Sequence, residues 1–431
     1  MRPQDTHREL LRGLYDAAVA AAHPRSCLPT ALPPPPPAPG RIILLAAGKA
    51  AASMTAVAVA HYAPLLAQTP GRLEGIAVTR IGYGEPTGPV RLVEAGHPVP
   101  DAAGIAATRD TLDLAASAGA DDLVLVLLSG GGSANWIAPA GDLTLEEKRD
   151  ITRRLLRSGA AIGEINTLRK RLSLIKGGRL AVQAAPATLV TLAISDVPHD
   201  DPSVIASGPT VPDPSTIAQA QAVAARHRLD LPPAARALLA DGIADTPKPG
   251  DPAFARSRFT IIARPADALA AAAAAARTAG YETVLLGADL EGEARDVAAD
   301  HAARAIAFAR DGRKVALLSG GELTVTIQGS GRGGPNQEYA LALAVALAGA
   351  PGICAVAGDT DGTDGGGGSA QDPAGAFIDP TTLARARAAG LDPAAMLADN
   401  DSTGFFSALG DLLAPGPTRT NVNDIRVVLV G

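Results

Sequence analysis

The sequence predicts an α/β fold built from two domains, and three observations support this. The chain has 431 residues, which is more than one ordinary hydrophobic core organises. Short apolar runs alternate with helical stretches from residue 41 onward, as in a parallel sheet covered on both faces. Segment 245–252 then carries three prolines in eight residues and no periodicity, which is typical of a linker. We therefore expect a first domain over 1–245, with an N-terminal helix and a proline-rich spacer to about residue 40, and a second domain over 250–431.

The elements of the first domain follow from local apolar patterns. Residues 7–22 carry apolar side chains at helical spacing, and Pro33–Pro37 is expected to form a stiff spacer. The continuous apolar run that ends at Leu128 predicts a strand buried on both faces. The same reasoning gives helices at 7–22, 49–62, 102–118, 145–159, 216–228 and 232–241, and strands at 42–46, 75–79, 90–94, 122–128 and 187–194.

The second domain is predicted to contain a mixed sheet. The segment 317–325 resembles a hairpin, so a strand over 322–328 is expected to return beside the strand over 314–319. The remaining predicted strands are 259–263, 282–286, 353–357 and 423–430, and the helices are 266–279, 291–310 and 336–348. Together the two halves give a doubly layered α/β protein without an internal repeat.

Composition excludes several classes of protein. The net charge of −6 gives no electrostatic reason to expect a nucleic acid or an anionic membrane as partner. Cys27 and Cys354 are too few and too far apart for a disulfide framework or a thiolate zinc site. No apolar run approaches the roughly 18 residues of a membrane span. We expect a cytoplasmic protein that acts on a small molecule.

Two glycine turns follow predicted strands of the first domain. Gly48 and Lys49 come directly after the first strand, where a helix start presents free backbone N–H groups to an anion. Only six lysines occur in the chain, so Lys49 is a less ordinary surface charge than an arginine would be. Segment 129–133 (Ser-Gly-Gly-Gly-Ser) follows the most apolar strand and suits an anion nest. The alternative for each is a purely structural turn.

A second pair of polar segments lies later in the first domain. Segment 196–210 packs three carboxylates and three hydroxyls after a buried strand, at the sheet edge where ligands bind in open α/β folds. Segment 169–179 gathers five cations, and in helical geometry Arg169 and Lys176 would lie on one face. Bound anions and a solvated basic helix are equal alternatives for this run.

Three polar loops adjoin predicted strands of the second domain. Segment 329–338 is rich in glycine, carries Arg332 and feeds a helix at Asn336. Segment 358–365 carries acids at 359, 361 and 364. It is not a calcium loop, because the twelfth position counted from Asp359 is Ala370, where such a loop has Glu. Segment 416–424 precedes the last strand. Each loop alone is compatible with a surface turn.

Taken together, these segments resemble the glycerate 2-kinase family, whose C-terminal half is the MOFRL domain. The resemblance implies a Rossmann-like N-terminal domain, a smaller α/β C-terminal domain and an active site in the cleft between them. It also implies phosphorylation of D-glycerate at its 2-hydroxyl by ATP and Mg²⁺, giving 2-phosphoglycerate and ADP. Two residues depart from the family pattern, since His199 stands where glycine is usual and Pro335 where many relatives have arginine. The matching segments, in the family's order, are 48–49, 96–101, 129–135, 166–176, 195–196, 200–202, 207–210, 320–322, 331–338, 360–365, 374–376 and 416–424.

The resemblance also implies roles for individual residues. Lys49, Asp196, Asp361 and Asp364 are the expected catalytic residues, with Asp196 and Asp361 as expected Mg²⁺ ligands. Which carboxylate binds the metal and which accepts the hydroxyl proton stays open. A homodimer is the oligomeric state to test. The expected substrate- or nucleotide-binding residues are Ser129, Gly130, Gly131, Gly132, Ser133, Asn166, Arg169, Lys176, Ser207, Gly208, Glu322, Arg332, Asn336 and Asn421.

Two other functions compete with this one. Some family members carry the older name hydroxypyruvate reductase, an NAD(P)H-dependent activity. That activity predicts Gly-x-Gly-x-x-Gly after an early strand, whereas the turn here is Ala-Ala-Gly-Lys-Ala-Ala at 46–51. A non-catalytic nucleotide-binding protein is the second competitor, because His199 and Pro335 are also compatible with a decayed site.

Overall fold

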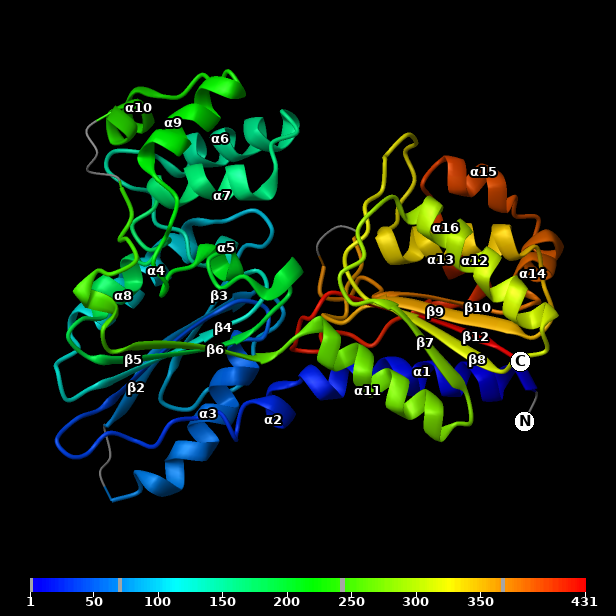
Figure 1. Cartoon of the computed structure of the whole chain (residues 1–431), viewed down its shortest axis with the longest axis horizontal. Coiled ribbons are helices and arrows are strands. Elements are labelled where there is room, and N and C mark those ends of the chain that lie inside the picture. The colour runs from blue at the N-terminus through cyan, green and yellow to red at the C-terminus, as the bar shows by residue number, and fades with distance from the viewer. Residues whose placement is uncertain (1–2, 69–71, 241–244, 366–368) are drawn as a thin grey trace. The chain divides into compact units, whose positions relative to one another are not determined.

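A computed structural model describes residues 3–68, 72–240, 245–365 and 369–431, and these form two compact units (Figure 1). One unit, here called the parallel-sheet unit, spans Cys27–Ile262. The other, the mixed-sheet unit, combines Met1–Ser26 with Ala263–Gly431. The predicted domain ranges, 1–245 and 250–431, differ from these units at the N-terminal segment and at the strand near residue 260.

The parallel-sheet unit is built on a six-stranded sheet with the order β3-β2-β1-β4-β5-β6. The pairings that join β3, β2, β1, β4 and β5 are parallel, as a doubly wound fold requires. The bounds are β1 Ile42–Ala47, β2 Leu73–Arg80, β3 Arg91–Ala95, β4 Leu123–Leu128, β5 Thr188–Ile194 and β6 Ser257–Ala263, with α2 Pro24–Cys27 entering the unit and helices α3 Ala51–Leu65, α4 Ala102–Ala116, α5 Gly132–Asn135, α6 Leu145–Arg157, α7 Ile162–Arg171, α8 Arg179–Ala184, α9 Ile217–Arg226 and α10 Pro233–Ala240.

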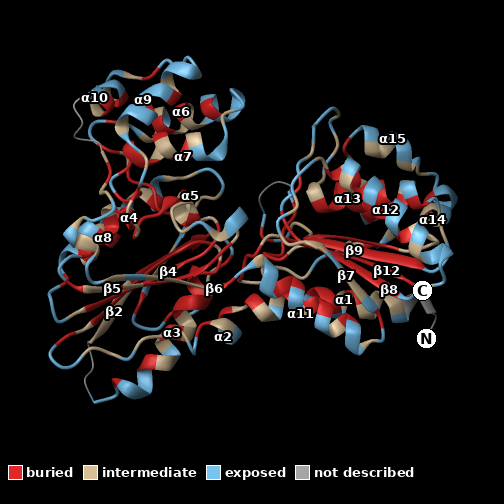
Figure 2. Ribbon diagram, viewed as in Figure 1, coloured by how far each residue is buried: buried red, intermediate tan, exposed pale blue. Residues whose placement is uncertain are grey.

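The central strands are buried on both faces, which is why their sequences are apolar throughout. Every residue of β1 and β4 is buried. Figure 2 shows the strand labelled β4 in the colour of buried residues. Helix α3 covers one face of the sheet, and α4 and α8 cover the other (Figure 1). In the register, Ala47 pairs with Leu128, and Leu128 pairs with Ala193. The loops that follow β1, β4 and β5 therefore leave the sheet at the same edge.

Helices α6, α7, α9 and α10 form a separate small core beside this sheet (Figure 1). Leu155, Leu168 and Val223 are buried in it. Thr144 and Glu147 form a capping box that fixes the start of α6. This helical layer carries the basic run predicted from the sequence.

The mixed-sheet unit contains the order β11-β10-β9-β12-β8-β7. Strands β7 and β8 are parallel, whereas β12 runs antiparallel to β8 and β9, and β10 antiparallel to β9 and β11. The predicted mixed sheet is thus confirmed. The bounds are β7 Glu282–Gly287, β8 Val315–Ser319, β9 Ile353–Asp359, β10 Gly375–Ile378, β11 Leu412–Leu413 and β12 Asp424–Val430, with helices α1 Pro3–Ala22, α11 Pro265–Thr278, α12 Ala294–Arg310, α13 Pro335–Leu347, α14 Thr382–Ala388, α15 Pro393–Ala398 and α16 Ser402–Leu409.

The N-terminal helix α1 belongs to this unit because it packs on α11 and on strands β9 and β12 (Figure 1). Tyr15 donates a hydrogen bond to the carbonyl of Asp359 at 2.8 Å, and Arg8 pairs with Asp411 at 2.7 Å. Strand β6 instead lies beside β5, so the parallel sheet continues past the proline-rich segment to residue 262.

The predicted strand over 322–328 is wrong. Strand β8 already has β12 on one side and β7 on the other, so no edge remains for a returning strand. Apart from an isolated bridge between Thr324 and Glu293, this segment runs outside the sheet. The sequence patterns also missed β10, β11 and the short helices α14 to α16.

Candidate functional site

Lys49 lies at the sheet edge between the loops after β1 and β4. The Lys49 N–H donates to the carbonyl of Gly130 at 2.8 Å. A Cβ placed on Gly131 would lie 3.3 Å from Cγ of Lys49 and 3.1 Å from Nε2 of His97. Gly131 adopts φ +85°, a conformation that favours glycine. The lysine, the glycine loop and His97 are therefore neighbours, as the strand register requires.

Position 48 also requires glycine, because the loop after β4 lies very close to the backbone there. Gly48 has φ +121°, and a Cβ there would lie 2.4 Å from Oγ of Ser129. That hydroxyl accepts the N–H of Ala50 at 2.9 Å, at the start of α3. The backbone N–H groups of Gly130 and Gly131 have no acceptor among the residues that the structure describes. They are available to an anion, as in an oxyanion nest.

Ser133 links this glycine loop to the segment that follows β5. Its Oγ lies 2.7 Å from Oγ of Ser207, and its carbonyl accepts Nζ of Lys176 at 2.8 Å. A Cβ on Gly132 would lie 3.0 Å from Cβ of Ala206. Three of the predicted binding residues, Ser133, Lys176 and Ser207, therefore form one contiguous group.

The segment 199–208 is held in an unusual backbone conformation. His199, Asp200, Ala206, Ser207 and Gly208 all have φ between +50° and +62°, the left-handed region. His199 thus adopts the conformation for which the glycine usual at this position is suited. Strain of this kind in a loop at the ligand-binding edge of a sheet is a recognised sign of function. The predicted metal ligand Asp196 lies half-buried two residues after β5.

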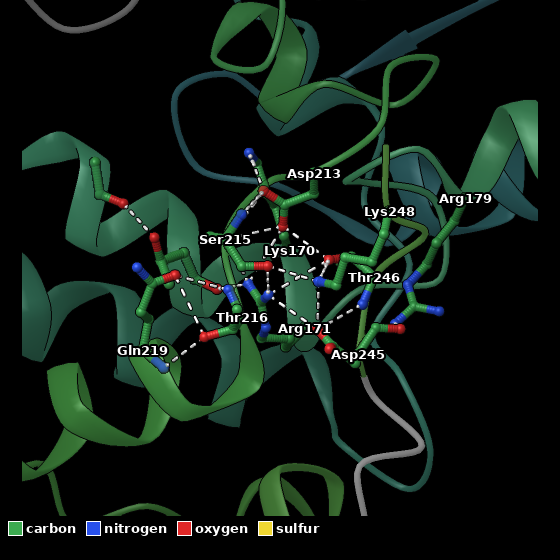
Figure 3. Close-up of polar contacts among 12 residues, drawn as sticks. Lys170, Arg171, Arg179, Asp213, Ser215, Thr216, Gln219, Asp245, Thr246 and Lys248 are labelled. Atoms are coloured by element: carbon green, nitrogen blue, oxygen red, sulfur yellow. Dashed lines mark hydrogen bonds and ion pairs between the residues drawn. The ribbon is translucent and has the colours of Figure 1, made fainter. Parts of the chain in front are cut away.

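The basic run 169–179 divides into two groups. Helix α7 ends at Arg171, so the predicted placement of Arg169 and Lys176 on one helical face is wrong. Lys170 and Arg171 form a buried ion-pair network with Asp213 and Asp245, which Figure 3 shows. Lys176 instead points to Ser133, and Asn166 is buried on α7.

In the mixed-sheet unit, Asp364 holds the start of α13. Its two carboxylate oxygens accept the backbone N–H and side-chain amide of Asn336 and of Gln337 at 2.9–3.2 Å. Burial and the nearby Asp424 raise the pKa of Asp364 to about 7, although hydrogen bonds from Asn336 and Gln337 oppose that shift. In this arrangement Asp364 positions the helix N-terminus.

Asp361 and Asp424 lie in the same buried region. Oδ1 of Asp361 accepts the N–H and hydroxyl of Thr363 at 2.7 and 3.0 Å. Asp424 accepts Nδ2 of Asn336 at 2.7 Å and pairs with Arg426. Burial raises the pKa of Asp424, Arg426 lowers it, and Asp361 raises it further. The region concentrates negative charge beside a helix N-terminus.

The other predicted residues of this unit are spread more widely. Asn421 is buried and its Oδ1 accepts the N–H of Asn423 at 3.2 Å. Glu322 and Arg332 are exposed. Pro335 occupies the first turn of α13, a position that tolerates proline because its N–H is not needed there.

The residues present suit Mg²⁺ better than a metal held by protein alone. Across residues 3–68, 72–240, 245–365 and 369–431, no group of three or more His, Cys, Asp or Glu side chains is arranged to hold a metal ion. Mg²⁺ in phosphoryl-transfer sites is held by one or two carboxylates, waters and substrate phosphates. Asp196 and Asp361 each carry a carboxylate of the kind that such a site uses.

Three residues at these positions were not singled out from the sequence. His97 contacts Gly131, Asp424 faces Asn336, and Lys148 is buried near Arg169. The scarcity of lysine in this sequence could have drawn attention to Lys148. The structure shows that three of the six lysines are buried, Lys148 among them. His97 and Asp424 lie in segments 96–101 and 416–424, but only the fold places them.

Comparison with known proteins identifies the family. Residues 10–240 match a domain of unknown function, DUF4147, and residues 315–424 match the MOFRL family. The chain is 38% identical over 362 residues to D-glycerate 2-kinase of Thermotoga maritima, which covers 83% of this chain and 84% of that one. The chain belongs to the glycerate 2-kinase family.

Two further comparisons refine this assignment. The crystal structure of Thermotoga maritima glycerate kinase matches with a TM-score of 0.86 and 35% identity, covering 99% of this chain and 100% of that chain. An Agrobacterium vitis protein with the name "Putative hydroxypyruvate reductase" is 49% identical over 430 residues, 98% of this chain and 94% of that one. Both names that the sequence analysis weighed thus occur among the relatives of this glycerate kinase family member.

No described helix is long and apolar enough to cross a membrane.

Proposed function

We propose that this protein is a glycerate 2-kinase, which transfers a phosphoryl group from ATP to the 2-hydroxyl of D-glycerate with Mg²⁺. The products would be 2-phosphoglycerate and ADP. The supporting observation is the match to a glycerate kinase structure over 99% of this chain, together with the contiguous group of Lys49, Gly131 and His97 at the ligand-binding edge of the parallel sheet.

Phosphoryl transfer depends on positioning and charge neutralisation more than on covalent chemistry by the protein. The ammonium of Lys49 would offset phosphate charge, and the N–H groups of Gly130 and Gly131 would donate to phosphate oxygens. When bound, Mg²⁺ neutralises charge that develops on the phosphates, and Asp196 or Asp361 is the proposed ligand. The other carboxylate is the proposed acceptor of the hydroxyl proton.

We assign Asp364 a positioning role rather than a catalytic one. Its carboxylate already accepts four hydrogen bonds from Asn336 and Gln337. Those bonds fix the N-terminus of α13, because Asn336 and Gln337 donate their backbone N–H groups to Asp364 and Glu338 donates its own to the carbonyl of Gly334. A cytoplasmic location and a homodimeric state stay predictions.

The experiment that tests this proposal compares two reactions of the purified protein. In the first, D-glycerate, ATP and Mg²⁺ are incubated and the phosphoglycerate isomer is identified by ³¹P NMR. In the second, NADH oxidation is followed with hydroxypyruvate. We expect 2-phosphoglycerate in the first and no NADH oxidation in the second. The turn after β1, Gly48-Lys49-Ala50, supports this expectation, because it lacks the second and third glycines of a dinucleotide fingerprint. NADH-dependent reduction without ATP turnover would overturn the proposal.

A further inference from the structure

The parallel-sheet unit holds two groups of buried or half-buried cations, which differ in whether carboxylates neutralise them. The first group, Lys170, Arg171 and Lys248, is neutralised within the protein (Figure 3). Lys170 pairs with Asp213 at 3.2 Å, Arg171 with Asp213 and Asp245 at 3.3 and 3.0 Å, and Lys248 with Asp245 at 2.7 Å. Hydroxyls of Ser215 and Thr246 complete the network.

The second group consists of Lys148, Arg169 and Lys176, and it has no carboxylate. Lys148 is 5% exposed and donates to the carbonyl of Leu172, and Lys176 is 1% exposed and donates to the carbonyl of Ser133. Among the residues that the structure describes, none of the three forms an ion pair. The Arg169 guanidinium also has no hydrogen-bond acceptor there.

These three cations repel one another. Burial, Arg169 and Arg179 together lower the pKa of Lys148 to about 7. Burial, Arg169 and Lys148 hold the pKa of Lys176 well below its usual range. Arg179 differs from the group, because the nearby carboxylates of Asp245 and Asp213 raise its pKa and oppose the lowering by burial. Burying like charges without a counter-charge is costly, so a bound anion would relieve the repulsion and restore the lysine charges.

The group adjoins the glycine loop described above. Lys176 binds the carbonyl of Ser133, whose hydroxyl contacts that of Ser207. An oxyanion bound here would thus lie near the loop after β4. The planar guanidinium of Arg169 suits a carboxylate or phosphate, because it donates through two parallel N–H groups.

We propose that Lys148, Arg169 and Lys176 form a buried oxyanion subsite. Its ligand is a carboxylate or a phosphoryl group, and the carboxylate of the hydroxy acid substrate is the source that the structure favours. Lys49 and the glycine loop already provide a phosphate site at the sheet edge, whereas no cation other than this group is assigned to the substrate carboxylate. The choice of substrate rests on the proposed function, but the subsite itself does not.

The test measures binding to the full-length protein by isothermal titration calorimetry, without turnover. The probes are D-glycerate, glycerol (which lacks the carboxylate), ADP and inorganic sulfate. The variants are Lys148→Met and Arg169→Met, with Lys314→Met as a control at an exposed lysine of the other unit. We expect Lys148→Met and Arg169→Met to weaken sulfate binding about tenfold or more, since a charge-assisted hydrogen bond is lost, and the control to leave it unchanged.

The probes also separate the two sources of the oxyanion. Weaker binding of D-glycerate with ADP unaffected assigns the subsite to the carboxylate, and the reverse assigns it to a phosphoryl group. Unchanged binding of sulfate, D-glycerate and ADP in both folded variants would overturn the proposal. Because sulfate binding requires no kinase activity, a protein that binds sulfate through these residues but makes no phosphoglycerate would refute the proposed function alone. Lys148→Met retains the apolar stem, and Arg169 is half-buried, so two independent variants guard against loss of folding.

Discussion

Ser133 and Ser207 lie with their hydroxyl oxygens 2.7 Å apart, although 74 residues separate them in the chain. Ser133 belongs to α5, directly after the glycine loop of β4, and Ser207 lies in the strained segment after β5. This hydrogen bond therefore joins the two loops that parallel strand register brings to one edge. Removing either hydroxyl should therefore affect both loops, and this can be tested by substitution.

Substituting either serine with alanine should weaken activity and stability together. Each of Ser133→Ala and Ser207→Ala should lower the free energy of unfolding by about 1 kcal/mol, because one hydroxyl loses its partner. The double variant should cost less than the sum of the single ones, measured by urea denaturation. Strict additivity would show that the two hydroxyls do not interact.

Lys49→Ala should cut kcat/KM for D-glycerate by about 100-fold or more, since a fixed charge beside a phosphate is lost. The melting temperature should stay nearly unchanged, because the side chain is only half-buried. Lys314→Ala serves as the matched control, since this lysine is exposed and belongs to the other unit. Near-normal kinetics in Lys49→Ala would make this residue an ordinary surface charge.

His199→Gly should stabilise the protein. The left-handed conformation, φ +61°, costs a non-glycine residue about 1 kcal/mol, which glycine avoids. The greater chain entropy of glycine in the unfolded state opposes part of that gain. We therefore expect an increase of up to about 1 kcal/mol in the free energy of unfolding, measured by urea denaturation. A clear loss would mean that interactions of the imidazole outweigh the backbone strain.

Asp364→Asn should destabilise the mixed-sheet unit and lower kcat. An amide would present N–H groups to donors on Asn336 or Gln337, so two hydrogen bonds are lost, at about 1 kcal/mol or more each. Asp361→Asn should instead lower the Mg²⁺-dependent rate at least about tenfold with a smaller effect on stability. The decisive measurement compares the loss of rate with the loss of unfolding free energy in each variant. If Asp364→Asn and Asp361→Asn change rate and stability to the same extent, Asp364 does not have a distinct positioning role.

Local patterns predicted most of the fold because the central strands are buried on both faces. Runs such as Leu123–Leu128 cannot be exposed, so the sequence alone indicated β1, β4, β5, β9 and β12. The pattern of residues 322–328 is compatible with a strand, but this strand does not form. Both sides of β8 are already occupied, by β12 and β7. That competition depends on β12, about a hundred residues later, which no local pattern contains.

The sequence predicted which loops carry the candidate site residues, but not which side chains contact one another. Strand ends gave Lys49 and the glycine turn, whereas the neighbours of each side chain came from the fold. The basic run looked uniform in sequence, yet Asp213 and Asp245 neutralise Lys170 and Arg171 and leave Arg169 and Lys176 without a carboxylate among the described residues. Only the positions of those distant acids separate a structural network from an oxyanion subsite.

Lys148→Met should be more stable than the parent protein, and the difference should depend on pH. The folded pKa of Lys148, about 7, lies below its unfolded value near 10.4, so the folded state disfavours the ammonium. The resulting cost is complete below pH 7 and disappears as the pH rises toward the unfolded value. The advantage of the variant should therefore be larger at pH 6.5 than at pH 9.5, and narrow by up to about 1.4 kcal/mol per pH unit between them.

Sulfate provides the second arm of this last prediction, because it keeps its double charge across that pH range. Bound sulfate would restore the ammonium of Lys148, so it should raise the melting temperature of the parent protein more at pH 6.5 than at pH 9.5. In Lys148→Met that difference should shrink, because one of the titrating lysines is gone. Sulfate stabilisation that is equal at both pH values in the parent protein would mean that the anion does not bind at Lys148, even if the variant itself proves more stable.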